Sequence, residues 1–129
     1  MLDHIGFPVS SFLHSKRFYE AALEPLGVSL MAELSAEQTG SSSHAGFGEN
    51  GKPWFWIGDG EGVLRGRFHV AFAARRRADV DAFHRAALAM GGRDNGPPGL
   101  RPHYHEHYYA AFVLDPDGHN IEAVCHNPA

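Results

Sequence analysis

A carboxylate stands inside the most regular strand pattern of the chain. Residues 119–125, HNIEAVC, are apolar at Ile121, Ala123 and Val124, and Glu122 lies in their middle. An isolated charge is very costly to bury, so Glu122 is predicted to be paired or bound to a cation. The cation is either a metal ion or an arginine such as Arg67 or Arg101.

A second group of chemically capable residues lies shortly before this strand. His103, His105 and His107 alternate with other polar residues, and at the period of two of a strand they project from one face. We interpret His103 and His105 as candidates for acid–base catalysis or for an extra ligand, and His107 as a candidate for the substrate pocket. The alternative is a polar loop at the rim of a site.

The composition is that of one globular domain of 129 residues, with 43% hydrophobic and 20% charged residues. A net charge of −4 gives no basic surface, so we expect no nucleic-acid partner. No stretch reaches the ~18 apolar residues of a membrane span, and no signal peptide is visible, so we expect no membrane partner. A single cysteine, Cys125, favours a reducing, cytoplasmic location.

The elements that must position these residues occur in two series. The first comprises a strand at 2–9, a helix at 12–26, a strand at 28–33, a loop at 35–44, and a hairpin of 45–48 with 54–57. A Gly-rich linker at 59–67 follows. The second comprises a strand at 68–73, a helix at 78–90, a Gly/Pro loop at 94–102, and a final hairpin that turns at Asp115-Pro116-Asp117-Gly118.

The two series match at a nearly constant offset. His4 recurs 65 positions later as His69, and Phe18 recurs at the same offset. The turn of the second hairpin is two residues longer, so the offset rises to 67 beyond it and Phe55 matches Glu122. This repetition predicts an α+β fold of two tandem βαβββ modules, at about 1–60 and about 67–126.

The closing sequence DPDGHNIEAV, the two modules and a histidine in the opening strand of each together resemble the vicinal oxygen chelate superfamily. This superfamily includes glyoxalase I, extradiol dioxygenases, fosfomycin-resistance proteins and bleomycin-binding proteins. The resemblance covers essentially the whole chain, taken as one domain at 1–129. It implies a cup-shaped mixed sheet with helices outside, a divalent metal inside, a small-molecule substrate and a homodimer.

By this resemblance, the metal ligands are His4, His69 and Glu122. The fourth ligand position falls at Phe55, or at a neighbouring tryptophan if the register differs, and none of these side chains binds a metal in the usual way. Three protein ligands leave coordination positions open for a substrate. Fe, Zn, Mn, Ni and Co all remain open as the metal, with oxygen chemistry for Fe(II) and Lewis-acid chemistry for the others.

Two main functions follow. One is a glyoxalase-like or dioxygenase-like enzyme whose substrate chelates the metal through adjacent oxygens, with Glu122 as the remaining candidate for a catalytic base. The other is a metal-free binding protein of the bleomycin-resistance type, in which Trp54 and Trp56 line the cup and stack on a flat ligand. A thiol transferase acting on an epoxide ranks below both, because no potassium or phosphonate loop is recognisable. The site forms within one chain or is shared across a two-fold interface.

Overall fold

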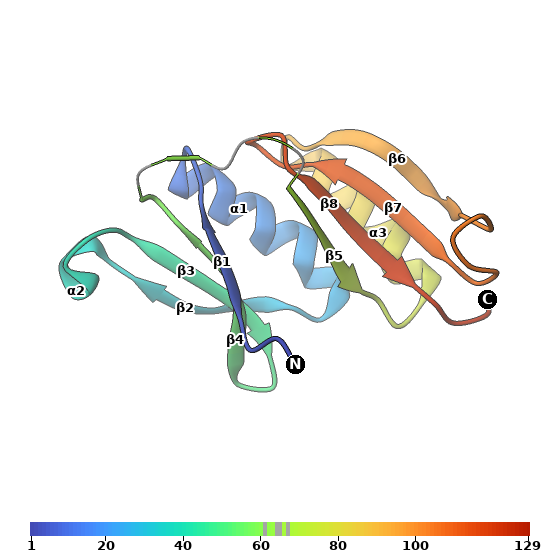
Figure 1. Cartoon of the computed structure of the whole chain (residues 1–129), viewed down its shortest axis with the longest axis horizontal. Coiled ribbons are helices and arrows are strands. Elements are labelled where there is room, and N and C mark those ends of the chain that lie inside the picture. Colours follow the sequence, from blue (N-terminus) through green and yellow to red (C-terminus); the bar gives the residue numbers. More distant parts are fainter. Residues whose placement is uncertain (61, 64–65, 67) are drawn as a thin grey trace.

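Each half of the chain folds as a strand, a helix and three further strands (Figure 1). The computed structural model describes residues 1–60, 62–63, 66 and 68–129. The first module contains β1 (Ile5–Pro8), α1 (Phe12–Leu23), the 3₁₀ turn η1 (Glu24–Leu26), β2 (Ser29–Leu34), α2 (Ala36–Thr39), β3 (His44–Glu49) and β4 (Lys52–Gly58). The second contains β5 (His69–Ala73), α3 (Arg77–Ala89), β6 (Arg93–Leu100), β7 (Tyr109–Leu114) and β8 (Asn120–Cys125).

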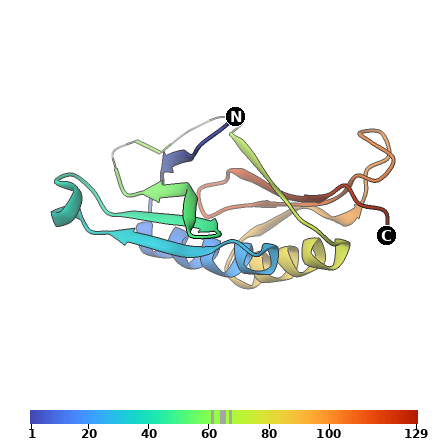
Figure 2. The same ribbon diagram turned by 90° about the horizontal axis from the view of Figure 1, so that it is seen from below.

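Each module forms its own four-stranded mixed sheet. The strand orders are β1-β4-β3-β2 and β5-β8-β7-β6. In each sheet the first and last strands of the module are parallel neighbours, and the other pairs are antiparallel. Helices α1 and α3 cover the same side of the two sheets, so the opposite faces carry no long helix (Figure 2). The predicted α+β fold of two repeated modules with helices outside is confirmed.

The predicted helix at 12–26 is confirmed as α1 followed by η1. Ser11 caps its start, because the Ser11 hydroxyl accepts a hydrogen bond from the backbone N–H of His14 at 3.4 Å. Pro25 lies in the 3₁₀ turn, and the chain leaves the helix at Gly27, whose φ is 79°. Local residue chemistry therefore fixes the start of α1 and the end of η1.

The predicted loop at 94–102 is wrong, because it contains most of β6. β6 is the outermost strand of its sheet and pairs with β7 through two register shifts. Pro97 and Pro98 donate no backbone hydrogen bond, and proline is tolerated in a strand at a sheet edge. The predicted loop at 35–44 contains the short helix α2. The predicted linker at 59–67 includes residues 61, 64, 65 and 67, which lie outside the described residues.

The strand registers correct the predicted match between the modules. Gly6 of β1 pairs with Trp56, and at the equivalent place of the second module Ala71 pairs with Glu122. Trp56, not Phe55, is therefore the counterpart of Glu122. Phe55 is fully buried beneath the sheet, and a slip of one residue in a strand exchanges its two faces.

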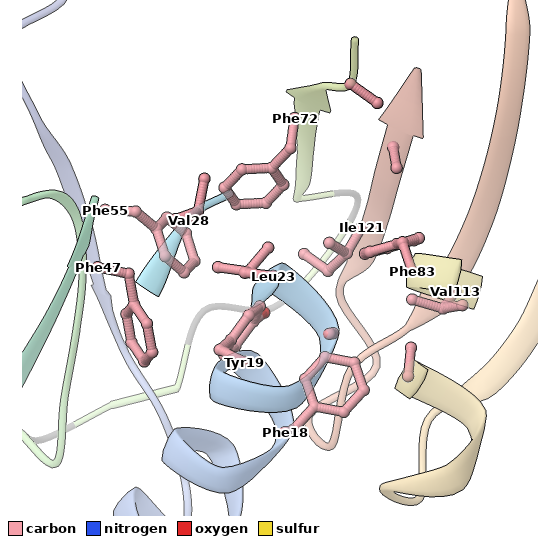
Figure 3. Close-up of a cluster of buried hydrophobic side chains, with 14 of the residues drawn as sticks. Phe18, Tyr19, Leu23, Val28, Phe47, Phe55, Phe72, Phe83, Val113 and Ile121 are labelled. Carbon is pink, nitrogen blue, oxygen red and sulfur yellow. The ribbon is translucent and has the colours of Figure 1, made fainter. Parts of the chain in front are cut away.

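One hydrophobic core lies between the helices and both sheets and joins the modules (Figure 3). Burying one large apolar side chain contributes about 1.5–3 kcal/mol, so this cluster is the main cohesive force of the fold. No helix in the described part of the chain is long and apolar enough to cross a membrane. The largest fully buried side chains include Tyr19, Phe18, Phe47, Phe55, Phe83, Leu23, Ile57, Ile121, Val80 and Val113.

A buried carboxylate at the turn of the final hairpin also ties the two modules together. Asp115 is 2% exposed and accepts a hydrogen bond of 2.5 Å from the Tyr19 hydroxyl of α1. Its other oxygen accepts from the backbone N–H groups of Asp117 and His119 at 2.9 and 2.8 Å. Asp117 accepts from the backbone N–H and the hydroxyl of Ser10, just after β1. Both aspartates of the DPDG turn thus hold the last hairpin onto the first module.

Tyr19→Phe should lower the free energy of unfolding by about 1.5–3 kcal/mol, because one oxygen of Asp115 then stays buried without a donor. Tyr109→Phe is the matched control, since its phenol is part-buried and donates to Asp81 at 2.7 Å. The control should cost about 1 kcal/mol or less. Urea unfolding followed by circular dichroism measures both variants. Equal losses would contradict a special role for the Tyr19–Asp115 bond.

Candidate metal centre

His69 of β5 and Glu122 of β8 lie side by side in the second module. The parallel register sets Glu122 opposite Ala71, two residues beyond His69, so the His69 and Glu122 side chains leave the same face of the sheet. Nε2 of His69 lies 3.0 Å from Oε1 of Glu122. Glu122 is only 2% exposed, whereas the His69 side chain is 41% exposed. A buried carboxylate therefore meets an imidazole that reaches the solvent.

The other polar atoms of this pair are occupied by neighbouring groups. Nδ1 of His69 donates to the carbonyl oxygen of Asn120 at 2.8 Å, which leaves the lone pair of the neutral ring on Nε2. The Tyr108 hydroxyl donates to Oε2 of Glu122. Burial, this hydrogen bond and the charge of Glu122 raise the pKa of Tyr108 well above its ordinary value, so the phenol remains a donor at neutral pH.

Two hydrogen-bond acceptors thus face each other across 3.0 Å, and they require a proton or a cation between them. A proton on His69 would give an ion pair. A metal ion would satisfy both atoms, because two ligand atoms bound at about 2.1 Å and at right angles, as in an octahedral site, lie about 3 Å apart. Imidazole with carboxylate is a donor set that suits zinc, iron and manganese. The pair therefore fits two adjacent ligands of a divalent ion.

His4 lies apart from this pair, just before β1. Its side chain is 61% exposed, and Nδ1 donates to the carboxylate of Asp3 at 2.6 Å. Hydrogen bonds from Lys52 and His4 lower the pKa of Asp3, so the carboxylate stays ionised. An imidazole with one nitrogen held by a carboxylate presents the other nitrogen as metal-ligating histidines do.

The three predicted ligands do not meet within one chain. Across the described residues, no three His, Cys, Asp or Glu side chains gather into a group that could hold a metal ion. His4 instead borders a hollow of about 500 Å³ together with Trp54 and Lys52. The structure thus brings together His69 and Glu122, and it places His4 on the other module.

The histidines before the final hairpin lie in a loop rather than in a strand. Residues 101–108 form successive turns between β6 and β7, so the period of two that predicted a common face does not apply. His103 packs on Tyr104 with ring centroids 4.2 Å apart, and His105 lies 6.2 Å from His107. The loop ends at the tyrosine that donates to the buried carboxylate. The loop alternative is therefore the one that the structure shows.

Tyr108 and Asn120 belong to the site, although their spacing gives no sign of it. Tyr108 precedes Glu122 by 14 residues and reaches it across the β7–β8 hairpin. Asn120 acts through its backbone carbonyl, which carries no sequence signal. The alternation of tyrosine with histidine before the hairpin is the one pattern that marks the neighbourhood of Tyr108.

Among the described residues, the predicted ion pair between Glu122 and an arginine is not formed. The Arg101 guanidinium donates to the carbonyl oxygens of Gly99 and Pro97, both at 2.8 Å. It also lies over the ring of Phe112 at 5.4 Å. Arg67 lies outside the described residues.

The two tryptophans border separate hollows of the first module. Trp54 packs on Phe72 with ring centroids 5.8 Å apart and borders the hollow that contains His4. Trp56 borders a second hollow of about 340 Å³, together with His44. Both tryptophans predicted for the substrate pocket therefore reach a surface that a small molecule can enter.

Comparisons with known proteins identify the family. The chain matches the family model described as Glyoxalase/Bleomycin resistance protein/Dioxygenase superfamily over residues 1–123, and it belongs to this family. The crystal structure of a glyoxalase/bleomycin resistance protein from Albidiferax ferrireducens is similar at 30% identity. The match covers 99% of each chain with a TM-score of 0.78. No curated protein sequence matches the chain.

Two more distant structures share the fold. One is a variant of the fosfomycin resistance protein FosX from Listeria monocytogenes, complexed with Mn(II) and dihydroxypropylphosphonic acid. It is 21% identical, with a TM-score of 0.69 over 96% of this chain and 90% of that one. The other is glyoxalase I from Zea mays, which is 19% identical with a TM-score of 0.66. This chain is covered over 95%, and it spans 43% of the glyoxalase.

Tyr108→Phe should weaken Mn²⁺ binding by about 10- to 100-fold, because the phenol orients the carboxylate that would hold the ion. Tyr104→Phe is the matched control, since Tyr104 lies in the same loop, 5.1 Å from the Tyr108 ring, and is 60% exposed. The control should bind Mn²⁺ as the wild type does. Calorimetric titration of metal-depleted protein measures the affinities. An unchanged affinity in Tyr108→Phe would show that the phenol has no part in holding a metal.

Proposed function

We propose that this protein is a small metal-dependent enzyme, glyoxalase-like or dioxygenase-like, whose substrate chelates a divalent metal through adjacent oxygens. The observation that carries the proposal is the convergence of His69 Nε2 and Glu122 Oε1 at 3.0 Å, with the other polar atom of each side chain already occupied. Members of the family use divalent metals, and the Mn(II) in the FosX complex supports the same role for this pair.

The third ligand in this proposal comes from a second copy of the chain. His4 belongs to the first module, and the His69–Glu122 pair belongs to the second. In a two-fold homodimer that sets the first module of one copy against the second module of the other, the partner's His4 completes the ligand set. The helix-free faces of both sheets support this arrangement, since they leave room for a partner (Figure 2). Each homodimer then contains two equivalent sites.

A divalent ion bound there would polarise the chelating oxygens of the substrate as a Lewis acid. The residues of the chain hold the site in place. Asn120 orients the ring of His69, and Tyr108 holds one oxygen of Glu122. Phe112 stacks on the His69 ring, with centroids 6.3 Å apart and planes at 28°, and shields one side of the pair from water.

Proton transfer to or from the substrate is assigned to residues next to the pair. Glu122 is the candidate base, because it is the carboxylate of the proposed metal pair. His103 and His105 lie in the adjoining turn-rich loop and are the candidate acid–base groups at the solvent side. His107, in the same loop, is the candidate pocket residue.

A second candidate function is a metal-free protein that binds or sequesters a small molecule, as bleomycin-resistance proteins do. The observation that favours it is Trp56, which occupies the counterpart position of Glu122 and offers no metal-ligating atom. Ligand affinity that survives complete chelation of metals would support this alternative.

The proposed compartment is the cytoplasm. Cys125 is a free, buried thiol whose sulfur lies 3.5 Å from the carbonyl oxygen of Arg75. Free thiols persist in reducing compartments, which supports this placement.

Purified anaerobically without a histidine tag, the wild-type protein should carry about one divalent ion per chain. His69→Ala and Glu122→Ala should lose the ion, because each removes one of the two converging ligand atoms. His84→Ala is the matched control, since it removes another histidine that contacts a carboxylate, that of Asp94 at 2.9 Å. Elemental mass spectrometry provides the measurement. A wild-type protein without metal, even after reconstitution with Fe, Mn, Co, Ni or Zn, would refute the enzyme proposal.

Mixing His4→Ala with Glu122→Ala should restore part of the metal content if each site is shared between two chains. After random subunit exchange about a quarter of all sites are intact. Each intact site combines the first module of a Glu122→Ala chain with the second module of a His4→Ala chain. Mixing His69→Ala with Glu122→Ala is the control, because both changes fall in the same module and no intact site can form. Metal content, measured after subunit exchange and desalting, distinguishes a shared site from one that is not shared. No recovery in the first mixture would contradict a site completed by the partner's His4.

A further inference from the structure

The first module contains a hollow that the proposed metal centre does not use. It measures about 340 Å³ and is bordered by Pro8 of β1, Trp56 and Gly58 of β4, and the polar residues Ser42 and His44. This volume lies at the lower end of small-molecule sites, which span about 300–1,000 Å³. Its size suits one small ligand group rather than a polymer.

The indole of Trp56 lies flat against the backbone of the neighbouring strand. Gly46 of β3 pairs with Trp56. A Cβ added at Gly46 would lie 2.8 to 2.9 Å from three atoms of the six-membered ring, which is closer than side-chain atoms approach. The ring therefore fills the space that glycine leaves, and it forms a fixed planar wall of the hollow.

His44, two pairs along the same β3–β4 ladder, is held in the same way. It pairs with Gly58, and a Cβ there would lie 2.7 Å from Nδ1 and 2.9 Å from Cε1 of the imidazole. Nε2 of His44 lies 2.9 Å from the Ser42 hydroxyl. The imidazole of His44 thus lies against Gly58 of the neighbouring strand β4 and is fixed there. The Ser42–His44 pair gives a polar edge to a mainly apolar hollow.

We propose that this hollow binds a planar aromatic group of a small molecule, stacked on Trp56, with a hydroxyl or amine at its edge hydrogen-bonded to the Ser42–His44 pair. A fixed indole favours another flat ring in an offset stack, and a saturated ring cannot cover the same area. A few placed polar groups in an apolar pocket fix the orientation of a ligand. The inference deepens the proposed function by naming the substrate class. The identification of this aromatic ligand as the substrate rests on the proposed function, whereas its binding to the hollow does not.

The probe is 2-naphthol, and the readout is the pair of indole N–H signals in a ¹⁵N–¹H correlation spectrum. The chain has two tryptophans, so Trp54→Phe and Trp56→Phe assign the two signals. 2-Naphthol should shift the Trp56 signal saturably and leave the Trp54 signal in place. Trans-decahydro-2-naphthol has the same carbon skeleton but no aromatic ring. Its affinity should be lower by about tenfold or more. Equal affinities for the two alcohols, or a shift of the Trp54 signal alone, would overturn the proposal.

Variants separate stacking from polar recognition. Gly46→Ala should displace the indole and weaken 2-naphthol binding by about tenfold. Trp56→Leu should do the same by removing the planar wall, and it serves where Gly46→Ala does not fold. His44→Ala should remove the preference for 2-naphthol over 2-methylnaphthalene. Unchanged affinity in Trp56→Leu, measured by the quenching of 2-naphthol fluorescence, would overturn the inference.

Glu122→Ala separates this inference from the proposed function. 2-Naphthol should bind this variant, and chelator-treated wild type, as tightly as the untreated protein, because the hollow contains no predicted metal ligand. Loss of binding in Glu122→Ala would overturn the assignment of an independent aromatic site. A metal-free wild type that still binds 2-naphthol at Trp56 would refute the enzyme proposal and uphold the aromatic site.

Discussion

The buried carboxylate of Asp115 decides where the last strand of this protein begins. It accepts the Tyr19 hydroxyl from α1 and two backbone N–H groups of its own turn. β8 starts at Asn120, whose carbonyl oxygen orients His69, and Glu122 follows two residues later. The placement of the His69–Glu122 pair thus depends on a structural carboxylate that does not contact it. A helix of the first module thereby sets the geometry of a site in the second.

The duplicated fold offers two equivalent positions, and the chain has filled them differently. In the second module this position is Glu122, a carboxylate that needs a cation and a phenol to be buried. In the first module it is Trp56, an indole that needs glycine on the next strand to lie flat. Glycine inside a strand weakens the strand by roughly 0.5–1 kcal/mol, a cost that the stacked indole offsets by covering the sheet. The two equivalent positions therefore differ in chemistry, with a buried carboxylate in the second module and a flat apolar ring in the first.

The sequence predicts much of the fold because its signals are local. Alternating apolar residues, the DPDG turn and the repeat define the two modules, and an acidic residue within an apolar strand singles out Glu122. The match of Phe55 to Glu122 fails because β3 and β4 change register between Phe47 and Gly48. A spacing count cannot detect a shift that depends on how two strands pair.

The remaining errors have the same physical origin. Glycine and proline indicate a loop at 94–102, yet pairing to β7 imposes a strand on most of it. The alternating histidines at 103–107 indicate a strand, yet the segment closes into turns. Tyr108 becomes a site residue only through a contact across the final hairpin. Strand pairing overrides local propensity in β6, and a contact across the hairpin recruits Tyr108, whereas at 103–107 local turn hydrogen bonds replace the expected strand.

Pro97 and Pro98 remove two backbone N–H groups from β6, the outermost strand of the second sheet. A free strand edge is a template on which further strands add, and repeated addition leads to fibres. An edge interrupted by two prolines and two register shifts cannot template a continuous ladder. At this edge, growth of the sheet from chain to chain is blocked. The irregularity of β6 therefore protects this edge of the second sheet from the strand-by-strand addition that builds fibres.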